Sequence, residues 1–577
     1  MDVHYDIVIV GGSLGGVAGA LSAGRLGASV CLLESSQWLG GQYTAQGVSK
    51  PDENRYIETV GSTRSYQAFK HAVRLYYRSN YHLSTRGKQQ PTLNPGGNYP
   101  GFSLDPRVGN TVLQQSLAEL PTVHVRTGIT VTNVEMNGDA VVSITASDST
   151  GVSTRYTASY FLDATDLGDL LPLCGQRDVD WVLGAESKGQ TQEPDAPDEA
   201  HPDWIQPVTF PFALEHRPAG EDHTITPPEN YDELKAAQQY SVIDGYIDSM
   251  FKPGKDMFGY RQFIESSNFA DPALPYDMTM MNCAANDYLG GTIPTGTPEG
   301  DAAVLAAARA ASLGFCYWIQ TECPRDDNPS KKGYPELKLR TDVFGTPDGT
   351  SAQPYIRESR RIKALTTVYQ QDVDSNHHPG PRAKLFPDSC GIGLYGGLDI
   401  HANPSVGMPQ SFAPVLPFQI PMSALIPVRW TNLIPACKNL GVTHITNGAY
   451  RLHPVEWNIG EAAGALAAFC VSQNVAPQAI PGSPAQAAFQ HVLLDAGVPL
   501  FWWSDVLLDS PYFAAVQLLG VHGYASGYGD MSYQPANEIT TAEKAAIEGA
   551  VGQPIQWPSS SLSRGEAALW LAQTLNL

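Results

Sequence analysis

The feature that most constrains the fold of this chain is its opening stretch, DIVIVGGSLGGVAGALSAGRLGASVCLLE, at residues 6–34. An apolar, β-branched run at residues 7–10 ends in glycines, and an Ala/Gly/Leu run of helical length follows. A second apolar run at residues 28–33 then ends on Glu34. This succession is typical of a βαβ unit. In the dinucleotide fingerprint, the glycines let the backbone approach a pyrophosphate at a helix N-terminus, and the acid binds a ribose. The stretch therefore predicts that the chain binds an ADP moiety.

The glycine turn departs from the G-x-G-x-x-G pattern at one position, because Ser13 stands where the middle glycine is expected. Serine is the smallest substitute, and its hydroxyl can bond a phosphate, so the approach of a nucleotide is only slightly hindered. A second glycine pair, in W-L-G-G-Q, suits a loop beneath the nucleotide; an ordinary turn is the alternative. The residues predicted to hold the nucleotide here are Gly11, Gly12, Ser13, Leu14, Gly15, Gly16, Glu34, Ser35, Gly40, Gly41 and Gln42.

Composition limits the partners of the chain. The formal net charge is −22, and no basic patch interleaved with aromatic residues occurs, so neither nucleic acid nor anionic lipid is an expected partner. No run of 18 apolar residues is present, and no membrane span is predicted. The eight cysteines lack CxxC spacing and indicate buried thiols. His377 and His378 lie in a Pro/Asn/Ser loop without helical ligand spacing, so no metal site is predicted.

The length of 577 residues allows two or three domains. Because the first strand begins at residue 6, no signal peptide is expected in this numbering, which favours a cytoplasmic protein. A trimmed precursor would look the same, so a secreted or cell-envelope protein is the alternative. The sequence does not indicate an oligomeric state.

The following segments extend the same architecture. Alternating residues predict strands at 123–125, 130–134 and 141–146, with a hairpin turn at 137–139. A buried strand at 160–162 runs directly into D-A-T-D-L-G-D. Helices are predicted at residues 65–77, 107–120, 300–320 and 458–472.

This order of a βαβ unit, a meander and a strand ending in D-A-T-x-x-G-D resembles the FAD-dependent oxidoreductases of the glutathione-reductase-like flavoprotein superfamily. In that superfamily the closing strand carries an ATG(D) motif next to the cofactor. Ala164, Thr165, Gly168 and Asp169 occupy the motif here, and Asp166 stands where it often has glycine. Strings such as GYPELKLR, PYIRESRRI, DSCGIGLYGGLDIH, PFQIPMSALIP and NGAYRLHPVEWNIGEAAG resemble a bacterial branch known simply as FAD-dependent oxidoreductases.

The resemblance implies an α/β fold with a doubly wound, Rossmann-type FAD-binding domain, an inserted β-rich substrate domain and a small α-helical C-terminal domain. It also implies FAD as the cofactor, with the N-terminus of the helix at 458–472 directed at the flavin ring. The sequence does not indicate whether the flavin is covalently attached. The residues that it adds to the expected FAD site are Val131, Ala164, Thr165, Asp169, Arg451, Asn458 and Ile459.

Three domains are expected from these features. The FAD-binding domain would combine residues 1–50, 101–180 and 421–475, and the substrate domain would combine residues 51–100 and 181–420. The tail, residues 476–577, carries capping boxes at Thr540/Glu543 and Ser563/Glu566 and resembles a single S-layer-homology repeat. A helical cap or a dimer contact is the alternative for the tail.

Candidate catalytic residues come from two segments and one neighbouring histidine. His453, with Tyr450, Arg451 and Glu456 in the same loop, is the first candidate for a base, because a histidine readily exchanges a proton near pH 7. The alternative is a structural histidine bonded to the backbone. His401, after a strand-like run at 398–400, is a weaker candidate.

The second segment is PYIRESRRI. Read as a strand, it places Arg357 and Arg361 on one face, with Glu358 and Arg360 on the other. These arginines could clamp a carboxylate or a phosphate, including the pyrophosphate of the cofactor; an internal ion-pair network is the alternative.

No second G-x-G-x-x-G follows a strand, and no CxxxxC pair occurs, so a pyridine-nucleotide domain is not expected. The predicted function is oxidation of an organic CH–OH or CH–NH donor by hydride transfer to flavin N5. An anionic group on the donor would suit the arginines, and a larger, glycosidic substrate is a further option. The electrons would pass to O2, a quinone or a carrier protein. The alternatives are a surface-associated binding protein with a structural FAD, and NAD in place of FAD.

Overall fold

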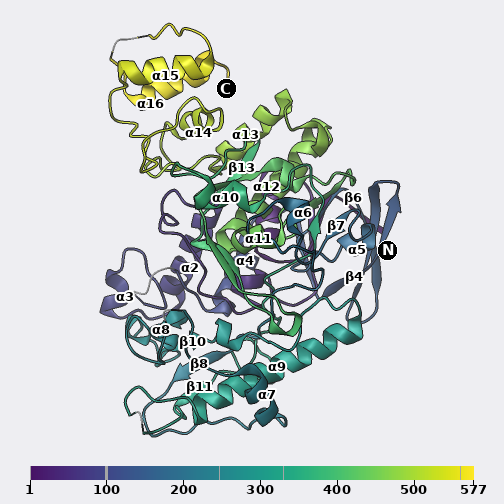
Figure 1. The fold of residues 1–577 in the computed structure, drawn as a ribbon, viewed down its shortest axis with the longest axis vertical. Helices are drawn as coiled ribbons and strands as arrows, with labels where there is room; N and C mark the ends of the chain where they lie inside the picture. The colour runs from purple at the N-terminus through teal and green to yellow at the C-terminus, as the bar shows by residue number, and fades with distance from the viewer. Residues whose placement is uncertain (1, 98–101, 246, 329, 559–560) are drawn as a thin grey trace.

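The computed structural model describes residues 2–97, 102–245, 247–328, 330–558 and 561–577. Within these residues, one seven-stranded sheet forms the centre of an α/β fold, in the order β3-β2-β1-β6-β5-β4 with β17 paired to β6 (Figure 1). Its strands are β1 (Asp2–Val10), β2 (Val30–Glu34), β3 (Val123–Thr127), β4 (Ile129–Asn137), β5 (Ala140–Asp148), β6 (Ser153–Asp163) and β17 (Leu433–Pro435).

Three segments far apart in the sequence build this sheet. β1 pairs in parallel with β2 on one side and with β6 on the other, and β17 runs parallel to the end of β6. The predicted hairpin is confirmed, because β4 and β5 pair antiparallel across Asn137 and Ala140. The division of the chain into three domains stays a prediction, and its boundary at residues 100 and 101 lies outside the described residues.

Alternation along β1 gives the sheet two buried faces. Ile7 and Ile9 join the core that contains helix α1 (Leu14–Arg25), whereas Val8 and Val10 join a second core against the meander β4–β6. Successive side chains of a strand point to opposite faces, so an unbroken apolar run indicates burial on both. β1 therefore lies between two packed layers, and the glycine turn that follows it is held in place from both sides.

Helix α12 (His453–Gln473) packs directly on α1, as its small residues predict. A Cβ added at Gly460 would lie 2.0 Å from the carbonyl oxygen of Gly15, so the two backbones are in contact. The predicted start at residue 458 is wrong, because α12 begins at His453. Pro454, in the first turn, is the sequence signal for the earlier start, since proline has no N–H and its fixed φ suits that position.

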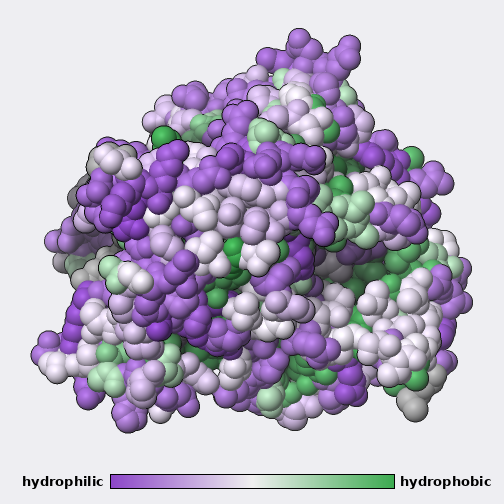
Figure 2. Space-filling model, turned by 90° about the horizontal axis from the view of Figure 1, so that it is seen from below, coloured by the Kyte–Doolittle hydropathy of each residue, from purple (hydrophilic) through white to green (hydrophobic). Residues whose placement is uncertain are grey.

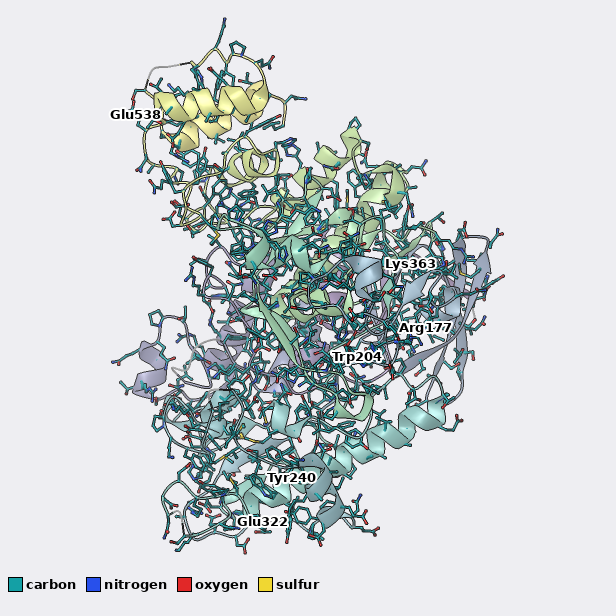
Figure 3. All side chains as sticks on the ribbon, in the orientation of Figure 1. Arg177, Trp204, Tyr240, Glu322, Lys363 and Glu538 are labelled. Carbon is teal, nitrogen blue, oxygen red and sulfur yellow. The ribbon has the colours of Figure 1, made fainter. Side chains whose placement is uncertain are left out.

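A second, smaller unit lies below the main sheet in Figure 1. It contains the antiparallel sheet β11-β8-β10-β9 and the long helix α9 (Pro298–Thr321), which includes the predicted helix at 300–320. Figure 3 places Tyr240 and Glu322 at this lower end. Seen from below, the surface is largely hydrophilic, and hydrophobic residues appear mainly in its hollows (Figure 2). The strands are β8 (Ala213–His216), β9 (Gln262–Ile264), β10 (Met278–Met280) and β11 (Leu337–Leu339).

By length and composition alone, α9 could cross a membrane, and it is the one helix among the described residues that meets this test. Its side chains Phe315 and Ile319 are buried in a core with Phe212 and Leu337. A core helix passes the same test, so α9 is weak evidence for a membrane span.

The remaining elements are short except for two helices near the N-terminus, α2 and α4, which contain most of the predicted helices at 65–77 and 107–120. The helices are α2 (Arg64–Asn80), α3 (Thr85–Gln89), α4 (Pro106–Ala118), α5 (Leu171–Cys174), α6 (Lys188–Thr191), α7 (Tyr231–Gln238), α8 (Met257–Tyr260), α10 (Gln370–Val373) and α11 (His444–Tyr450). The strands are β7 (Trp181–Val182), β12 (Arg361–Ile362), β13 (Ser389–Gly393), β14 (Gly397–Ile400), β15 (Ser411–Pro414) and β16 (Phe418–Pro421).

The tail contains α13 (Pro484–Ala496), α14 (Phe513–Val521), α15 (Thr541–Val551) and α16 (Arg564–Thr574). Both predicted capping boxes are confirmed, at the starts of α15 and α16. Glu538, labelled in Figure 3, lies far from the main sheet. The likeness of the tail to an S-layer-homology repeat stays a prediction.

Candidate functional site

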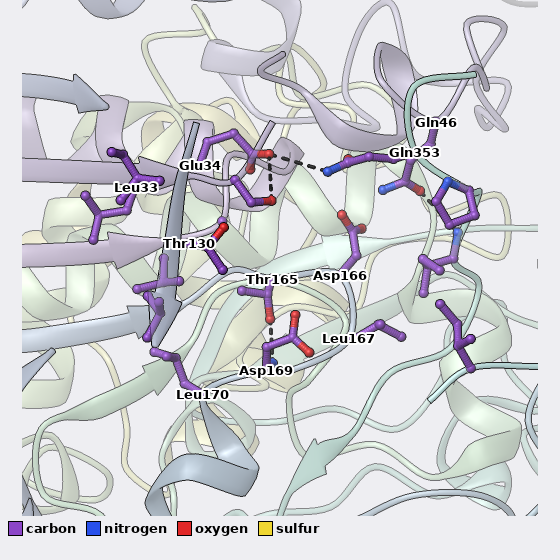
Figure 4. A pocket seen from close by; sticks show the side chains of 18 of the residues that line it. Leu33, Glu34, Gln46, Thr130, Thr165, Asp166, Leu167, Asp169, Leu170 and Gln353 are labelled. Atoms are coloured by element: carbon purple, nitrogen blue, oxygen red, sulfur yellow. Dashed lines mark hydrogen bonds between the residues drawn. The ribbon is translucent and has the colours of Figure 1, made fainter. Parts of the chain in front are cut away.

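A cavity of about 380 Å³ lies at the carboxyl ends of β1, β2 and β6. In open α/β sheets this edge is where nucleotides bind. Figure 4 shows the cavity with Glu34 and Thr165 on opposite sides of it. Six residues predicted from the sequence to bind the cofactor line it: Gly11, Glu34, Ser35, Val131, Thr165 and Asp169.

Glu34 is positioned by backbone amides at the end of β2. Its Oε2 accepts a hydrogen bond of 2.6 Å from Gly12 N, and its Oε1 accepts one of 2.7 Å from Ser36 N. These bonds fix the carboxylate beside the glycine turn, where an acid can bind the hydroxyls of an adenosine ribose. Gln353, from the far side of the cavity, approaches the same carboxylate at 3.5 Å.

The glycine turn is shaped so that only glycine fits at its first position. Gly11 has φ of +101°, and a Cβ there would lie 2.3 Å from the carbonyl oxygen of Ala164. Ser13, the departure from the fingerprint, caps α1 because its Oγ accepts from Gly16 N at 3.2 Å. The turn thus retains the open backbone that a pyrophosphate needs.

A buried charge cluster adjoins the N-terminus of α1. Glu456 Oε1 accepts from Gly15 N at 3.2 Å, and its Oε2 accepts from Gln42. The Lys438 ammonium, with a fully buried side chain, is bonded to Asp166 and lies 3.5 Å from Glu456 Oε2. Asp166, which stands where its motif often has glycine, therefore forms an ion pair with Lys438. Glu456 lies beside the glycine turn, apart from the other catalytic candidates.

Asp166, Cys437 and Glu456 are close enough together to hold a metal ion. Lys438 already supplies a positive charge to both carboxylates. Burial, followed by Glu456, raises the pKa of the Cys437 thiol well above its usual value, so this sulfur stays protonated. The Lys438 ammonium already provides the cation between the two carboxylates, so we assign no metal to this cluster.

A chain segment connects the nucleotide cavity to a buried polar network. Gln353 and Ile356 line the cavity, and the amide of Ile356 donates to Gln46 at 3.2 Å. The next residue, Arg357, leaves the cavity, and its Nη2 lies 2.8 Å from Asp287 Oδ1. The network therefore begins one residue beyond the cavity wall.

His401 lies between two aspartates in this network. Its Nδ1 donates to Asp287 Oδ2 at 2.6 Å, and its Nε2 lies 3.4 Å from Asp399 Oδ2. Burial and Arg357 lower the pKa of His401, but Asp287 and Asp399 outweigh them, so the net pKa is raised. The arrangement is an imidazole oriented by a carboxylate, with the second nitrogen available for proton exchange.

Two further arginines complete the network. Arg451 Nη2 binds Asp399 Oδ2 at 2.8 Å, and its Nη1 donates to the Tyr355 hydroxyl at 2.8 Å. Arg261 Nη1 binds Asp52 Oδ1 at 3.1 Å. Arg451, predicted to bind the cofactor, thus lies among the polar side chains around His401.

Several buried polar atoms in this region have no hydrogen-bond partner among the described residues. Buried polar groups are normally paired, so a group of unpaired ones marks a place where a ligand or water completes the bonding. They are Gln42 Oε1, Gln46 Nε2, Ser49 Oγ, Gln206 Nε2, Arg357 Nε, Arg451 Nε and His453 Nδ1.

His453 is fully buried, and its Nε2 donates to the carbonyl of Val48 at 3.1 Å. This bond leaves Nδ1 as an unprotonated acceptor without a partner. Burial, assisted by Arg261, lowers the pKa of His453 to about 3. His453 therefore suits the acceptance of a hydrogen bond better than the uptake of a proton, and its role as a base stays a prediction.

The arginine-rich segment is not the strand that the alternation assumed. Only Arg361 and Ile362 form a strand, β12, and Arg361 Nη1 binds Glu358 Oε1 at 3.0 Å, so these two side chains lie together rather than on opposite faces. Arg361 also binds Glu186 at 2.8 Å, apart from Arg357. The sequence allowed two interpretations of PYIRESRRI, an anion clamp and an internal ion-pair network. The contacts of Arg361 are those of the internal ion-pair network.

Three other candidates lie outside the network. Tyr450 stacks on Phe418 and donates its hydroxyl to the Gln419 carbonyl at 2.7 Å. Asn458 is not at a helix N-terminus as predicted; its Oδ1 accepts from Ile392 N at 3.1 Å, one turn inside α12. Ile459 is buried in the core.

Asp287 and Asp399 are candidate site residues that the sequence did not indicate, since both lie against His401. A signal for Asp399 was present, because it lies two residues before His401 and alternate residues of a strand share a face. Asp287 follows a short turn, η3 (Ala284–Asn286), and no local pattern connects it with His401.

Comparison with known proteins identifies one family. The model of the family described as FAD dependent oxidoreductase matches residues 6–493. No curated protein sequence matches the chain.

Three solved structures align over parts of the chain. L-proline dehydrogenase from P. horikoshii is 14% identical over 28% of this chain and 23% of its own, with a TM-score of 0.17. The p-nitrophenol 4-monooxygenase from Pseudomonas putida is 13% identical over 63% and 70%, with a TM-score of 0.26. The anhydrotetracycline hydroxylase from Streptomyces rimosus is 15% identical over 40% and 41%, with a TM-score of 0.20. The chain spans less than a quarter of the proline dehydrogenase.

Proposed function

Because the chain belongs to the FAD dependent oxidoreductase family, we propose that it oxidises an organic CH–OH or CH–NH donor and passes the electrons to O2, a quinone or a carrier protein. One observation is the main support for this proposal. His401 is partly buried, with 19% of its side chain exposed, and is held by Asp287, which also binds Arg357 at the end of the segment 353–357 beside the nucleotide cavity. A candidate proton acceptor, His401, thus lies just beyond the wall of the cavity that we assign to the cofactor.

The residues around the cavity fit FAD. The open glycine turn, the amide-bound Glu34 and the unpaired amide of Gln46 offer the groups that a dinucleotide needs. Bound FAD supplies the two-electron acceptor, which takes a hydride at N5. The protein then has to orient the donor, exclude water and remove the second proton.

His401 is the group that we assign to proton removal. Asp287 accepts from Nδ1, which leaves Nε2 to accept a proton from the donor. The imidazolium so formed is stabilised by Asp287 and by Asp399 at 3.4 Å. Arg451, bonded to Asp399 and Tyr355, holds the second aspartate in place.

The visible spectrum of the purified protein, recorded before and after acid precipitation, tests the cofactor and its attachment. We expect flavin absorbance that is released into the supernatant and, before precipitation, is bleached by a donor under anaerobic conditions. A protein that stays colourless after reconstitution with FAD would overturn the proposal. A bound NAD in its place would give no yellow colour.

The pH profile of donor oxidation tests the role of His401. The base must be neutral to accept a proton, and the pKa of His401 is raised above its ordinary value near 6.5. We therefore expect kcat/KM to rise with pH and to reach half of its plateau above pH 6.5. A rate that is constant from pH 5 to pH 9, about the range that brackets the ordinary histidine pKa, would remove His401 from this role.

The alternative of a surface-binding protein with a structural FAD is not favoured. The family match covers residues 6–493, which include the nucleotide cavity and every residue of the network around His401. The tail beyond residue 493 lies outside the match.

A further inference from the structure

When His401 is neutral, as a base must be, the charges around it are balanced before any donor binds. Each arginine of the network has its own aspartate: Arg261 with Asp52, Arg357 with Asp287, and Arg451 with Asp399. All six residues are buried or nearly so. Each of these guanidinium groups is therefore already paired with a carboxylate inside the protein.

Lys50 lies beside the network, because Arg261 Nη1 donates to its carbonyl oxygen at 2.6 Å. Burial, followed by the repulsion of Arg261, lowers the pKa of Lys50 to about 7, so near neutral pH it carries only part of a charge. A donor with a carboxylate or an ammonium group would add a further charge to this largely buried site. Burial of an unpaired charge is strongly unfavourable. The balance therefore disfavours both kinds of charged donor.

Next to this network lies a second cavity of about 560 Å³. Tyr395 belongs to its wall. Glu53, also in the wall, follows Asp52 of the network along the chain, and Tyr395 lies two residues before β14, which carries Asp399. The carboxylate of Asp52, more than burial and Asp399, raises the pKa of Tyr395 well above its usual value, in keeping with this placement. The second cavity therefore adjoins the network at Glu53 and Tyr395.

Apolar and aromatic side chains dominate the wall of this cavity. Tyr56, Leu394, Val415, Leu416 and Met531 contribute to it. Three charged residues also belong to the wall: Glu53, which is bonded to Lys70 at 2.8 Å, Arg55, whose guanidinium donates to the Tyr56 hydroxyl at 2.8 Å and lies over the Tyr56 ring, and Asp530. Both signs of charge are therefore present, and the cavity is large enough for a ring. Its chemistry suits an uncharged aromatic or alicyclic group.

The tail supplies part of this wall. Gly529, Asp530 and Met531 line the cavity, and Arg382 holds their loop to the body of the protein. The Arg382 guanidinium donates to the Trp502 carbonyl at 2.8 Å and to the Met531 carbonyl at 3.2 Å. The tail therefore packs on the body of the protein at the second cavity and forms part of its wall.

From the balanced ion pairs and the adjoining apolar cavity, we propose that the donor is an uncharged alcohol with an apolar ring. Its hydroxylated carbon lies among the arginine–aspartate pairs near His401, and its ring occupies the cavity walled by Tyr395 and the tail. This inference rests on the proposed function and assigns the donor class. The donor loses a hydride from carbon and a proton from its hydroxyl to become a carbonyl compound, with FAD as oxidant and His401 as proton acceptor.

Matched probes test the two parts of the proposal on the FAD-loaded protein. Phenyl β-glucuronamide against phenyl β-glucuronide, and hydroxymethylbenzamide against hydroxymethylbenzoate, differ in charge and hardly in size, because an amide replaces the carboxylate. Phenyl against methyl β-glucoside differs by the ring. Calorimetric titration gives the Kd of each probe, and anaerobic mixing gives the rate of flavin bleaching.

We expect the neutral member of each pair to have a Kd at least about tenfold lower than that of the anion. We also expect the phenyl ring to lower the Kd of the glucoside at least about tenfold. Gly396→Trp fills the cavity and should abolish the gain from the ring. A Cβ at Gly396 meets only Phe412, at 3.6 Å, so the variant should fold. Gly549→Trp, on the exposed face of α15, is the matched control and should keep the gain.

The two readouts separate failure of the inference from failure of the proposed function. Anions that bind as tightly as their neutral partners, a ring without effect, or a Gly396→Trp protein that keeps the gain would each overturn the inference. Probes that bind in the expected order, while no donor of any charge bleaches the flavin, would overturn the proposed oxidation instead. Absence of binding by every probe would also overturn the assigned donor class.

Discussion

Replacement of His401 by asparagine is expected to lower the rate of donor-dependent flavin reduction by about 10²- to 10⁴-fold, the usual contribution of a general base. The asparagine amide can still donate to Asp287, so the buried pair Arg357–Asp287 keeps its neighbours. FAD content and thermal stability should therefore change little. Anaerobic stopped-flow absorbance gives the rate, and the flavin spectrum of the same sample gives the content.

Two comparisons make this result specific. His378→Asn changes a loop histidine that is bonded to the Gln371 carbonyl and lies outside the network, so it should leave the rate unchanged. His453→Asn changes the other candidate base, whose pKa of about 3 makes it a weak proton acceptor. If His453→Asn loses the activity and His401→Asn keeps it, the assignment of the base is reversed.

The parts of the fold that the sequence predicted well are those with local signals. The apolar runs and the glycine turn predicted β1, α1 and β2, because burial, φ freedom and periodicity act within a few residues. Capping boxes predicted the starts of α15 and α16 for the same reason. The start of α12 was missed because the apolar, small-residue pattern begins at residue 458, whereas Pro454 marks the first turn.

The candidate site was only partly predictable, because its charges are paired across long distances in sequence. Arg357 and His401 were singled out by residue type, but their partner Asp287 lies on a turn far from both. An arginine-rich segment in an acidic chain indicates either an anion site or an ion-pair network. Only the fold, which brings a carboxylate to each arginine of the segment, decides between them.

This pairing also changes what the arginines do. A free guanidinium would hold an anionic donor, but a guanidinium bonded to aspartate offers polar groups without net charge. Arg451 illustrates the difference, since its two terminal nitrogens bind Asp399 and Tyr355 while its Nε has no partner. The network is therefore suited to bind hydroxyl groups and to hold His401 in place.

Replacement of Gly11 by alanine is expected to cost about 4 kcal/mol or more in the free energy of unfolding and to leave the protein without FAD. Gly11 has φ of +101°, and the new Cβ would lie 2.3 Å from the Ala164 carbonyl oxygen, so strain and collision act together. Gly11 directly follows β1, and Ala164 directly follows β6. Because these two strands are paired, their backbones cannot move apart to admit the new Cβ without loss of sheet pairing. Denaturant unfolding and the flavin absorbance of the purified protein measure the two effects.

Ser13→Gly is the matched variant, because it alters the same turn and restores the glycine of the fingerprint. Ser13 caps α1 through Gly16 N, and exchange of a capping serine for glycine costs only a few tenths of a kcal/mol. FAD content should stay at its original level. Equal loss of FAD in both variants would mean that the turn tolerates no change at all, whereas retention of FAD by Gly11→Ala would show that the contact of β1 with Ala164 does not shape the cofactor site.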